Sequence, residues 1–192
     1  PMSARRTAGI VVAASGYTGE RGFELAVPWD SAPDWFERIL TAGAPDGLVP
    51  VGLAARDTLR LEMKYALYGN DLDEQTNPLE AGLGWVTKLN KSGGFIGQAA
   101  LQAVKAAGVR RRLIGLRVDG RGIARHGYPV LDGDSVIGAV TSGTQSPSLG
   151  EAIAMAWVPP EKAAVGTTVA IDVRGRAVPA TVVTTPFLQR HT

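Results

Sequence analysis

Ser15 and Glu24 bound the stretch whose residue types and spacing best suit binding chemistry, because three glycines, a tyrosine and two carboxylates lie within its ten residues. The glycines suit turns with positive φ, and the alternating apolar pattern that follows predicts that Glu24 stands at the start of a strand. A carboxylate held there accepts two parallel N–H bonds from a planar group, such as a guanidinium or the 2-amino-4-oxo pyrimidine edge of a pterin. Tyr17 can stack on such a ring. The alternative interpretation is a hairpin corner in which Glu20 is solvated and Glu24 is structural.

Two arginines supply complementary charge. Arg56 and Arg60 are four residues apart in a segment, residues 52–62, that is predicted to be helical, so they share one face. Two neighbouring cations on a largely apolar helix require anions, and Asp57 and Glu62 are local candidates while Glu24 is a distant one. The alternative is a helix that extends both arginines into solvent. In a site for a flat ligand with an anionic tail, arginines would bind the tail. A carboxylate of the protein would bind the edge of the ligand ring, and tyrosines would contact its face.

Most other kinds of chemistry lack the residues that they need. The sequence has no cysteine, which excludes disulfides, thiolate chemistry and zinc ribbons, and neither His126 nor His191 has the partner spacing of a metal site. The acidic cluster at residues 71–74 lacks the ligand spacing of a calcium loop. The hydroxyl-rich run Thr141–Ser148 lacks a nucleophile elbow and is interpreted as a polar loop between strands. We therefore predict ligand binding without a metal, and we assign no catalytic residue to this chain.

Composition and charge are those of an ordinary globular protein. Hydrophobic residues make up 45% of the chain and charged residues 20%, the proportions of a folded domain. A net charge of +2 gives no sustained basic face for nucleic acid. No apolar run approaches the roughly 18 residues of a membrane span, and no hydrophobic stretch of a signal peptide follows the first arginines. We expect a cytoplasmic protein with no nucleic-acid and no membrane partner.

The pattern of apolar runs and turns predicts an α+β fold. Strands are expected at residues 10–14 and 23–27, on either side of the glycine-rich loop. One helix is expected after a cap at Asp30 or Ser31, and another over residues 97–107. Residues 77–86 are expected to form one helical turn that runs into a strand.

The second part of the chain is predicted to be a small closed barrel, because short apolar strands alternate there with turn residues. The expected strands are Leu113–Val118, Tyr128–Leu131, Ser135–Ser142, Ile153–Val158, Thr168–Val173 and Ala177–Thr184. A boundary is placed near residue 109, which gives domains 1–109 and 110–192.

Several motifs together resemble one family, the glycine-cleavage T-proteins or aminomethyltransferases. In the first part of the chain the motifs are Gly16–Glu24, Gly52–Glu62, Leu67–Glu74 and Pro78–Trp85. In the second part they are Arg121–Val130 and Gly138–Gly150. The resemblance covers essentially the whole chain in order, and the set is far more specific than any one motif.

The resemblance implies a reaction and a fold. Members of the family take an aminomethyl group from the lipoyl arm of the H-protein and transfer it to tetrahydrofolate, with methylenetetrahydrofolate, ammonia and the reduced lipoyl arm as products. The implied fold is the remainder of a ferredoxin-like α/β portion followed by a small C-terminal antiparallel β-barrel. The resemblance further implies folate-binding roles for Glu24, Arg56, Tyr17, Tyr65 and Arg190.

The sequence also departs from the family pattern. The family is roughly twice this length, and its N-terminal half, which carries an aspartate that acts on the folate, has no counterpart here. Ala14 and Ser15 stand where the family has Arg-Thr. The chain is therefore interpreted as the C-terminal half of a T-protein, inactive alone, with lipoylated H-protein, tetrahydrofolate and the missing N-terminal half as its partners.

Three other functions remain as alternatives. The C-terminal folate domain of a dimethylglycine- or sarcosine-oxidising enzyme would follow a flavin domain, of which the sequence shows no sign. A non-catalytic folate-binding module, similar to the iron–sulfur assembly and tRNA-modification relatives, would carry a Lys-Gly-Cys-Tyr-x-Gly-Gln-Glu signature, and this chain has no cysteine. A purely structural fragment would bind no ligand at all.

Overall fold

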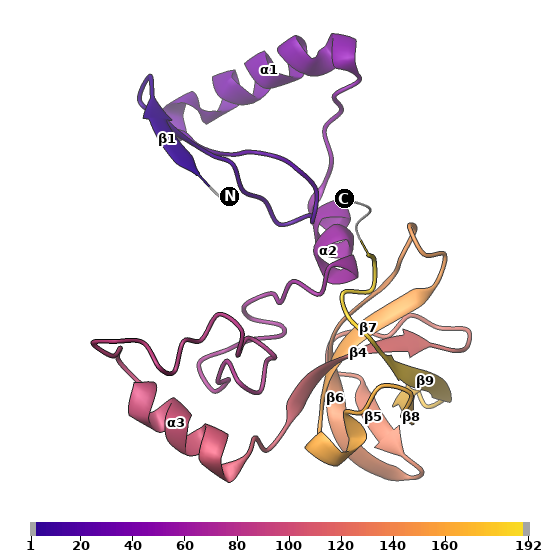
Figure 1. The fold of residues 1–192 in the computed structure, drawn as a ribbon. Helices are drawn as coiled ribbons and strands as arrows, with labels where there is room; N and C mark the ends of the chain where they lie inside the picture. Colours follow the sequence, from indigo (N-terminus) through magenta and orange to yellow (C-terminus); the bar gives the residue numbers. More distant parts are fainter. Residues whose placement is uncertain (1–2, 190–192) are drawn as a thin grey trace. The chain divides into compact units, whose positions relative to one another are not determined.

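The computed structural model describes residues 3–189. The described residues form two compact units, the first ending at Arg60 and the second beginning at Leu61. The first unit contains a three-stranded antiparallel sheet, and the second contains a closed six-stranded antiparallel barrel (Figure 1). The expected α+β class and C-terminal barrel are therefore confirmed.

The sheet of the first unit has the order β1-β2-β3. Its strands are β1 (Ala4–Thr7), β2 (Ile10–Ala13) and β3 (Glu24–Ala26). The predicted strands around the glycine-rich loop are thus present, and β2 and β3 pair from Val11↔Ala26 to Ala13↔Glu24. Strand β1 was not predicted, because its sequence, ARRT, lacks an apolar pattern.

Ala8 and Gly9 form the two-residue loop that joins β1 to β2, since Thr7 pairs with Ile10. Their φ angles are 46° and 78°, as a type I′ turn requires at both central positions. Alanine is poorly suited to positive φ, whereas asparagine tolerates it. We expect Ala8→Asn to stabilise the hairpin by about 0.5–1 kcal/mol, measured as slower amide hydrogen exchange in β1 and β2. Ala8→Val should have the opposite effect because a β-branched residue resists this conformation, and equal exchange in both variants would contradict the turn assignment.

The helices of the first unit follow the predicted pattern. They are η1 (Trp29–Ser31), α1 (Ala32–Gly43), η2 (Ala44–Asp46) and α2 (Leu53–Glu62), whose last two residues belong to the second unit. Ser31 occupies the N-cap position of α1, but its hydroxyl donates to the Pro28 carbonyl (3.0 Å) rather than to a helix amide. Gly47 closes the following turn with φ 81°.

The barrel has the closed strand order β4-β7-β6-β5-β8-β9. Its strands are β4 (Arg112–Val118), β5 (Pro129–Asp132), β6 (Ser135–Gln145), β7 (Ala152–Val158), β8 (Thr168–Asp172) and β9 (Ala177–Val183). The short helix η3 (Pro160–Lys162) follows β7. All six predicted strands are present, within a few residues of their expected bounds.

The barrel strands are buried on their inner face, and β4 and β7 are also buried on their outer face. Small and β-branched residues such as Val130, Ile171 and Ala180 fill the interior. A second apolar cluster, which contains Leu61 and Met155, packs against the outside of β4 and β7. Fully buried strands of this kind read as continuous apolar runs, so they were recognisable in the sequence.

Residues 77–86 form turns, and the strand expected there is wrong. The Asn77 side-chain oxygen accepts hydrogen bonds from the amides of Leu79 and Glu80, both at 3.0 Å. Local side-chain bonds of this kind compete with strand pairing. Helix α3 (Gln98–Ala107) follows as predicted, and Gly108 ends it with φ 84°.

Candidate functional site

The loop between β2 and β3 positions Glu24. The pair Ala13↔Glu24 ends the β2–β3 ladder, so the carboxylate lies at the point where the glycine-rich loop becomes a strand. The Ser15 hydroxyl donates a hydrogen bond to Glu24 Oε2 across the mouth of the loop. Gly19 takes a positive φ of 84° within it, whereas Gly16 and Gly22, which were also expected to, do not. Glu24 is exposed, so its carboxylate is held by a neighbour and still open to a ligand.

Arg56 lies over the ring of Tyr17. The guanidinium carbon is 4.8 Å from the ring centroid, which is a cation–π contact between α2 and the glycine-rich loop. The sequence indicated that both residues could contact a ligand, but it gave no sign that they contact each other. The contact holds the exposed Arg56 side chain against the loop that ends at Glu24.

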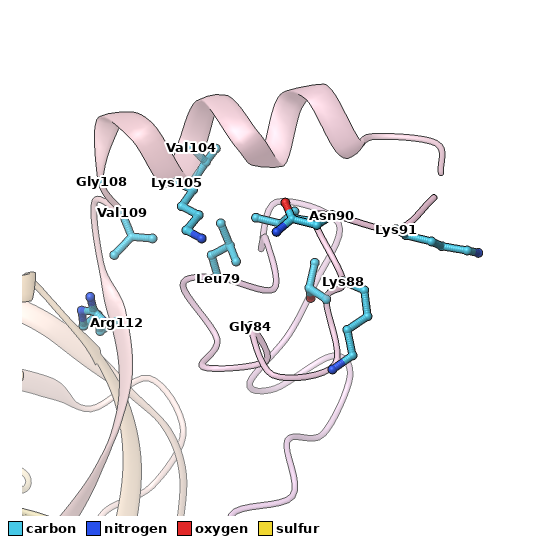
Figure 2. A pocket seen from close by; sticks show the side chains of 12 residues that line it. Leu79, Gly84, Lys88, Asn90, Lys91, Val104, Lys105, Gly108, Val109 and Arg112 are labelled. Carbon is cyan, nitrogen blue, oxygen red and sulfur yellow. The ribbon is translucent and has the colours of Figure 1, made fainter. Parts of the chain in front are cut away.

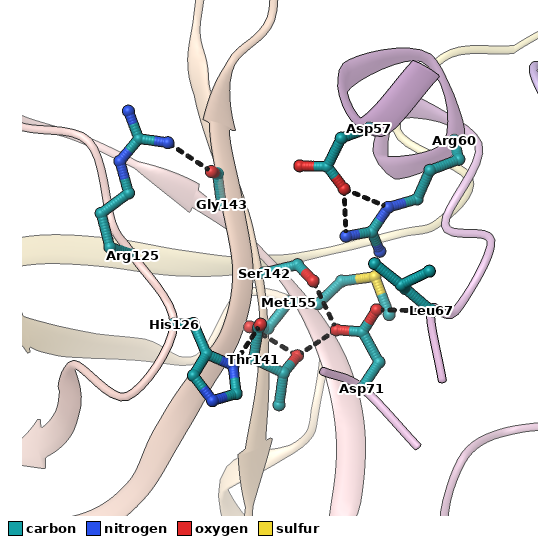
Figure 3. Close-up of polar contacts among 10 residues, drawn as sticks. All are labelled: Asp57, Arg60, Leu67, Asp71, Arg125, His126, Thr141, Ser142, Gly143 and Met155. Atoms are coloured by element: carbon teal, nitrogen blue, oxygen red, sulfur yellow. Dashed lines mark hydrogen bonds and ion pairs between the residues drawn. The ribbon is translucent and has the colours of Figure 1, made fainter. Parts of the chain in front are cut away.

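Asp57 is the local anion of Arg60. Its Oδ1 lies 2.6 Å from Arg60 Nη2 and 2.8 Å from Nε, a geometry in which both donors share one oxygen (Figure 3). Arg60 is buried, so the alternative of a solvent-extended arginine is wrong for this residue. Arg56 is exposed, and the two arginines of the helix therefore differ in role.

The other two predicted ligand-binding residues lie elsewhere. Tyr65 follows α2, belongs to the second unit and is half-buried. Arg190 lies outside the described residues. The structure thus brings Glu24, Tyr17 and Arg56 into one unit, with direct contacts from Ser15 to Glu24 and from Arg56 to Tyr17.

Asp71 is a buried carboxylate that the sequence did not indicate as important. Its Oδ1 accepts hydrogen bonds from the hydroxyls of Thr141 and Ser142, the latter at 2.7 Å, and its Oδ2 accepts one from the Leu67 amide at 2.8 Å (Figure 3). These bonds join the loop after α2 to strand β6. Burial lowers the pKa of the nearby Lys64 ammonium below its ordinary value, and the Asp71 carboxylate partly offsets that effect.

Glu62 is a second buried carboxylate with the same kind of partner. Its oxygens accept hydrogen bonds from the Ser146 hydroxyl at 2.5 Å and from the Ser148 hydroxyl at 2.9 Å. The run Thr141–Ser148 therefore is not simply a polar loop. Its first part continues β6, and its hydroxyls hold two carboxylates from residues 61–71. A dense row of hydroxyls was the signal that could have suggested buried acidic partners.

Within residues 3–189, no group of three or more His, Asp or Glu side chains is arranged to hold a metal ion. In the same range, none of the helices has both the length and the apolar character that crossing a membrane requires. The first unit thus contains an exposed carboxylate, Glu24, an exposed cation, Arg56, and the half-buried aromatic ring of Tyr17.

Two family models match this chain in order. The GCVT N-terminal domain matches residues 4–91, and the glycine cleavage T-protein C-terminal barrel domain matches residues 111–189. The chain belongs to the glycine cleavage T-protein family. The second match coincides with the six-stranded barrel, and the first includes four of the five predicted ligand-binding residues, all except Arg190.

Relatives of known name agree with this T-protein assignment. The chain is 50% identical over 179 residues to an aminomethyltransferase of Halothermothrix orenii. This alignment covers 93% of this chain and 50% of the relative. It is 52% identical over 176 residues to an aminomethyltransferase of Nostoc sp., covering 92% of this chain and 46% of the relative. The chain thus spans about half the length of the curated relatives that it matches.

A solved structure shows the same T-protein fold. The glycine cleavage system aminomethyltransferase T of Bartonella henselae superposes with a TM-score of 0.87 at 35% identity, over 95% of this chain and 50% of that chain. The family and the barrel fold inferred from the motifs are therefore confirmed.

Proposed function

We propose that this chain provides the folate-binding part of an aminomethyltransferase of the glycine cleavage system. The protein would move an aminomethyl group from the lipoyl arm of the H-protein to tetrahydrofolate, with release of ammonia. Support comes from the matches to both T-protein family models and from the exposed, Ser15-held carboxylate of Glu24 at the end of the glycine-rich loop. We also propose a cytoplasmic location and a domain boundary near residue 109, which falls in the unmatched interval 92–110.

We propose roles for five residues from the family resemblance and from the chemistry of their side chains. Glu24 accepts two N–H bonds from the 2-amino-4-oxo edge of the pterin ring, and Ser15 fixes the orientation of its carboxylate. Tyr17 and Tyr65 contact the ring faces. Arg56 and Arg190 hold the anionic tail, and a guanidinium already placed against Tyr17 loses little freedom when it does so. These residues bind and orient the acceptor, and we assign no proton transfer to them.

The reaction itself is tested by product formation. A protein that contains this chain, supplied with aminomethylated H-protein and tetrahydrofolate, should release ammonia and form methylenetetrahydrofolate in equal amounts. Binding of tetrahydrofolate without either product, under conditions in which a known T-protein reacts, would favour the non-catalytic folate-binding module.

Glu24→Gln should weaken tetrahydrofolate binding by about 1–3 kcal/mol, because an amide replaces one accepting oxygen by a donor that faces the ring N–H groups. Titration calorimetry measures the change. Glu20→Gln is the matched control, since it removes a charge from an exposed carboxylate of the same loop. Equal affinities in the wild type and Glu24→Gln would remove Glu24 from the site, and equal losses in both variants would show that only the charge of the loop matters.

A further inference from the structure

A cavity of about 730 Å³ lies in the second unit between α3 and the loop that precedes it (Figure 2). This volume falls within the range of roughly 300–1,000 Å³ that small-molecule sites occupy. One wall is the C-terminal part of α3 with Val104 and Lys105, and the facing wall is the segment 84–91. Leu79 lies between the two walls.

Hydrogen bonds connect the wall formed by residues 88–91 to α3. The Leu89 carbonyl accepts hydrogen bonds from the side-chain amides of Gln98 (2.6 Å) and Gln102 (3.2 Å), both on α3. The Lys91 amide also donates to the Lys88 carbonyl (3.0 Å), which closes a turn. These bonds connect the two walls of the cavity, which favours a preformed site.

The charge of the cavity has one sign. Lys88, Lys91, Lys105 and Arg112 line it, and no carboxylate does. Among residues 3–189, no Asp or Glu forms an ion pair with any of these four cations. Lys105 extends from α3 toward Leu79, and Lys91 points away from the cavity (Figure 2). Cations gathered without anions raise the local concentration of negatively charged ligands.

The remainder of the lining is largely apolar. Leu79, Leu89, Val104 and Val109 form this part, and Thr87 and Asn90 add polar groups. An inorganic ion alone would leave these apolar side chains in water. A molecule with both an apolar body and an anionic group would satisfy both parts of the lining.

We propose that this cavity binds a small organic anion, a molecule with an apolar ring or chain that carries a carboxylate or phosphate group. Lys105 on α3 holds the anionic group, and Leu79 and Val104 contact the apolar body. The Lys88 ammonium donates one hydrogen bond to the Trp85 carbonyl (2.9 Å), and it adds its remaining donors from the facing wall. None of Glu24, Tyr17 and Arg56 lines this cavity, and the proposal does not depend on the proposed folate-binding role.

Titration calorimetry with 1-naphthyl phosphate tests the proposal on the 192-residue chain. Two reference ligands carry one half of the chemistry each: 1-naphthol has the ring without the charge, and inorganic phosphate has the charge without the ring. We expect 1-naphthyl phosphate to bind at least about tenfold more tightly than either, since it gains charge-assisted bonds and apolar burial together. A parallel titration with 1-naphthoate distinguishes a carboxylate ligand from a phosphate ligand, and preference for either supports the site.

Variants locate the binding. The double substitution Lys88→Gln/Lys105→Gln should weaken 1-naphthyl phosphate binding about tenfold or more, while Lys88→Arg/Lys105→Arg should retain it because the charges remain. Lys162→Gln is the control, since Lys162 pairs with Asp132 (2.5 Å) outside the cavity, and it should change the affinity by less than about twofold. Undiminished binding in the double Gln variant, or binding of inorganic phosphate as tight as that of the naphthyl ester, would overturn the proposal. A loss of binding in the Arg variant as large as in the Gln variant would also overturn it, because binding would then not depend on the charges of the two lysines.

Discussion

Asp71→Ala is expected to lower the free energy of unfolding of the barrel unit by about 3–5 kcal/mol, the cost of removing one partner from a buried charged network. Asp71 is 1% exposed, and its carboxylate serves three donors: Thr141, Ser142 and the Leu67 amide. Alanine removes the carboxylate that these buried donors share, at about 1–3 kcal/mol for each donor that finds no other acceptor. The Thr141 hydroxyl also has the Met155 carbonyl within reach, at 3.2 Å. The half-buried Lys64 ammonium also loses the neighbouring charge that partly offsets its burial.

The measurement is hydrogen exchange of the most protected barrel amides, which reports the free energy of global opening for this unit. Glu74→Ala is the matched control, because Glu74 is an exposed carboxylate on the same loop. This substitution should change the free energy of global opening by less than about 0.5 kcal/mol. The cost of Asp71→Ala should fall sharply in a Thr141→Val/Ser142→Ala background, where two of the three donors are already gone. A cost that stays the same in that background would show that the hydroxyls do not stabilise the carboxylate.

The barrel was predictable because its signals are local. Each strand is an apolar run of β-branched and small residues, and the turns carry pairs such as Asp119-Gly120 and Arg174-Gly175 that suit tight reversals. Arg174 and Gly175 indeed both take positive φ. The number and spacing of the strands indicated a small closed barrel, whereas the strand order comes from the structure alone.

The contacts that fasten the barrel to its neighbouring loop were not predictable in the same way. Asp71 and Thr141 are 70 residues apart, and Glu62 and Ser146 are 84 apart. No periodicity connects positions at such distances, and a hydroxyl-rich run by itself is typical of a loop. Only the fold shows that these hydroxyls satisfy buried carboxylates, which is why the run was assigned to a connection rather than to the end of β6.

The candidate site was predictable in part. The glycine-rich loop and the alternation after it placed Glu24 at the start of a strand, where the structure has β3 begin. The Ser15 and Arg56 contacts, in contrast, depend on how the loop folds back and on where α2 lies against it. Residue types suggested the ligand chemistry, but the contacts that orient each group required the three-dimensional arrangement.

Gly138→Ala is expected to lower the free energy of unfolding of the barrel unit by about 3 kcal/mol, at the upper end of the range for overpacking. Gly138 lies in β6 beside β7, and a Cβ added there would be 1.9 Å from the Trp157 carbonyl oxygen. That neighbour is backbone, so no flexible side chain can move aside. Relief requires the β6–β7 ladder, which pairs Ala139 with Trp157, to shift, and a closed barrel transmits such a shift to its other strands.

The same reasoning predicts a comparable loss for Gly143→Ala, whose Cβ would lie 2.3 Å from the Ala124 carbonyl oxygen. Gly52→Ala is the control, because Gly52 has no positive φ and nothing lies within 4 Å of the added Cβ. This substitution should change the free energy of unfolding of the barrel unit by less than about 0.5 kcal/mol. Urea unfolding followed by circular dichroism and by hydrogen exchange in β6 and β7 measures all three. If Gly138→Ala and Gly52→Ala had equal effects, β6 would not approach β7 closely at this position, and glycine would be needed there only for chain flexibility. A selective loss in the two barrel variants would instead establish that strand closure at β6 depends on the absence of a side chain.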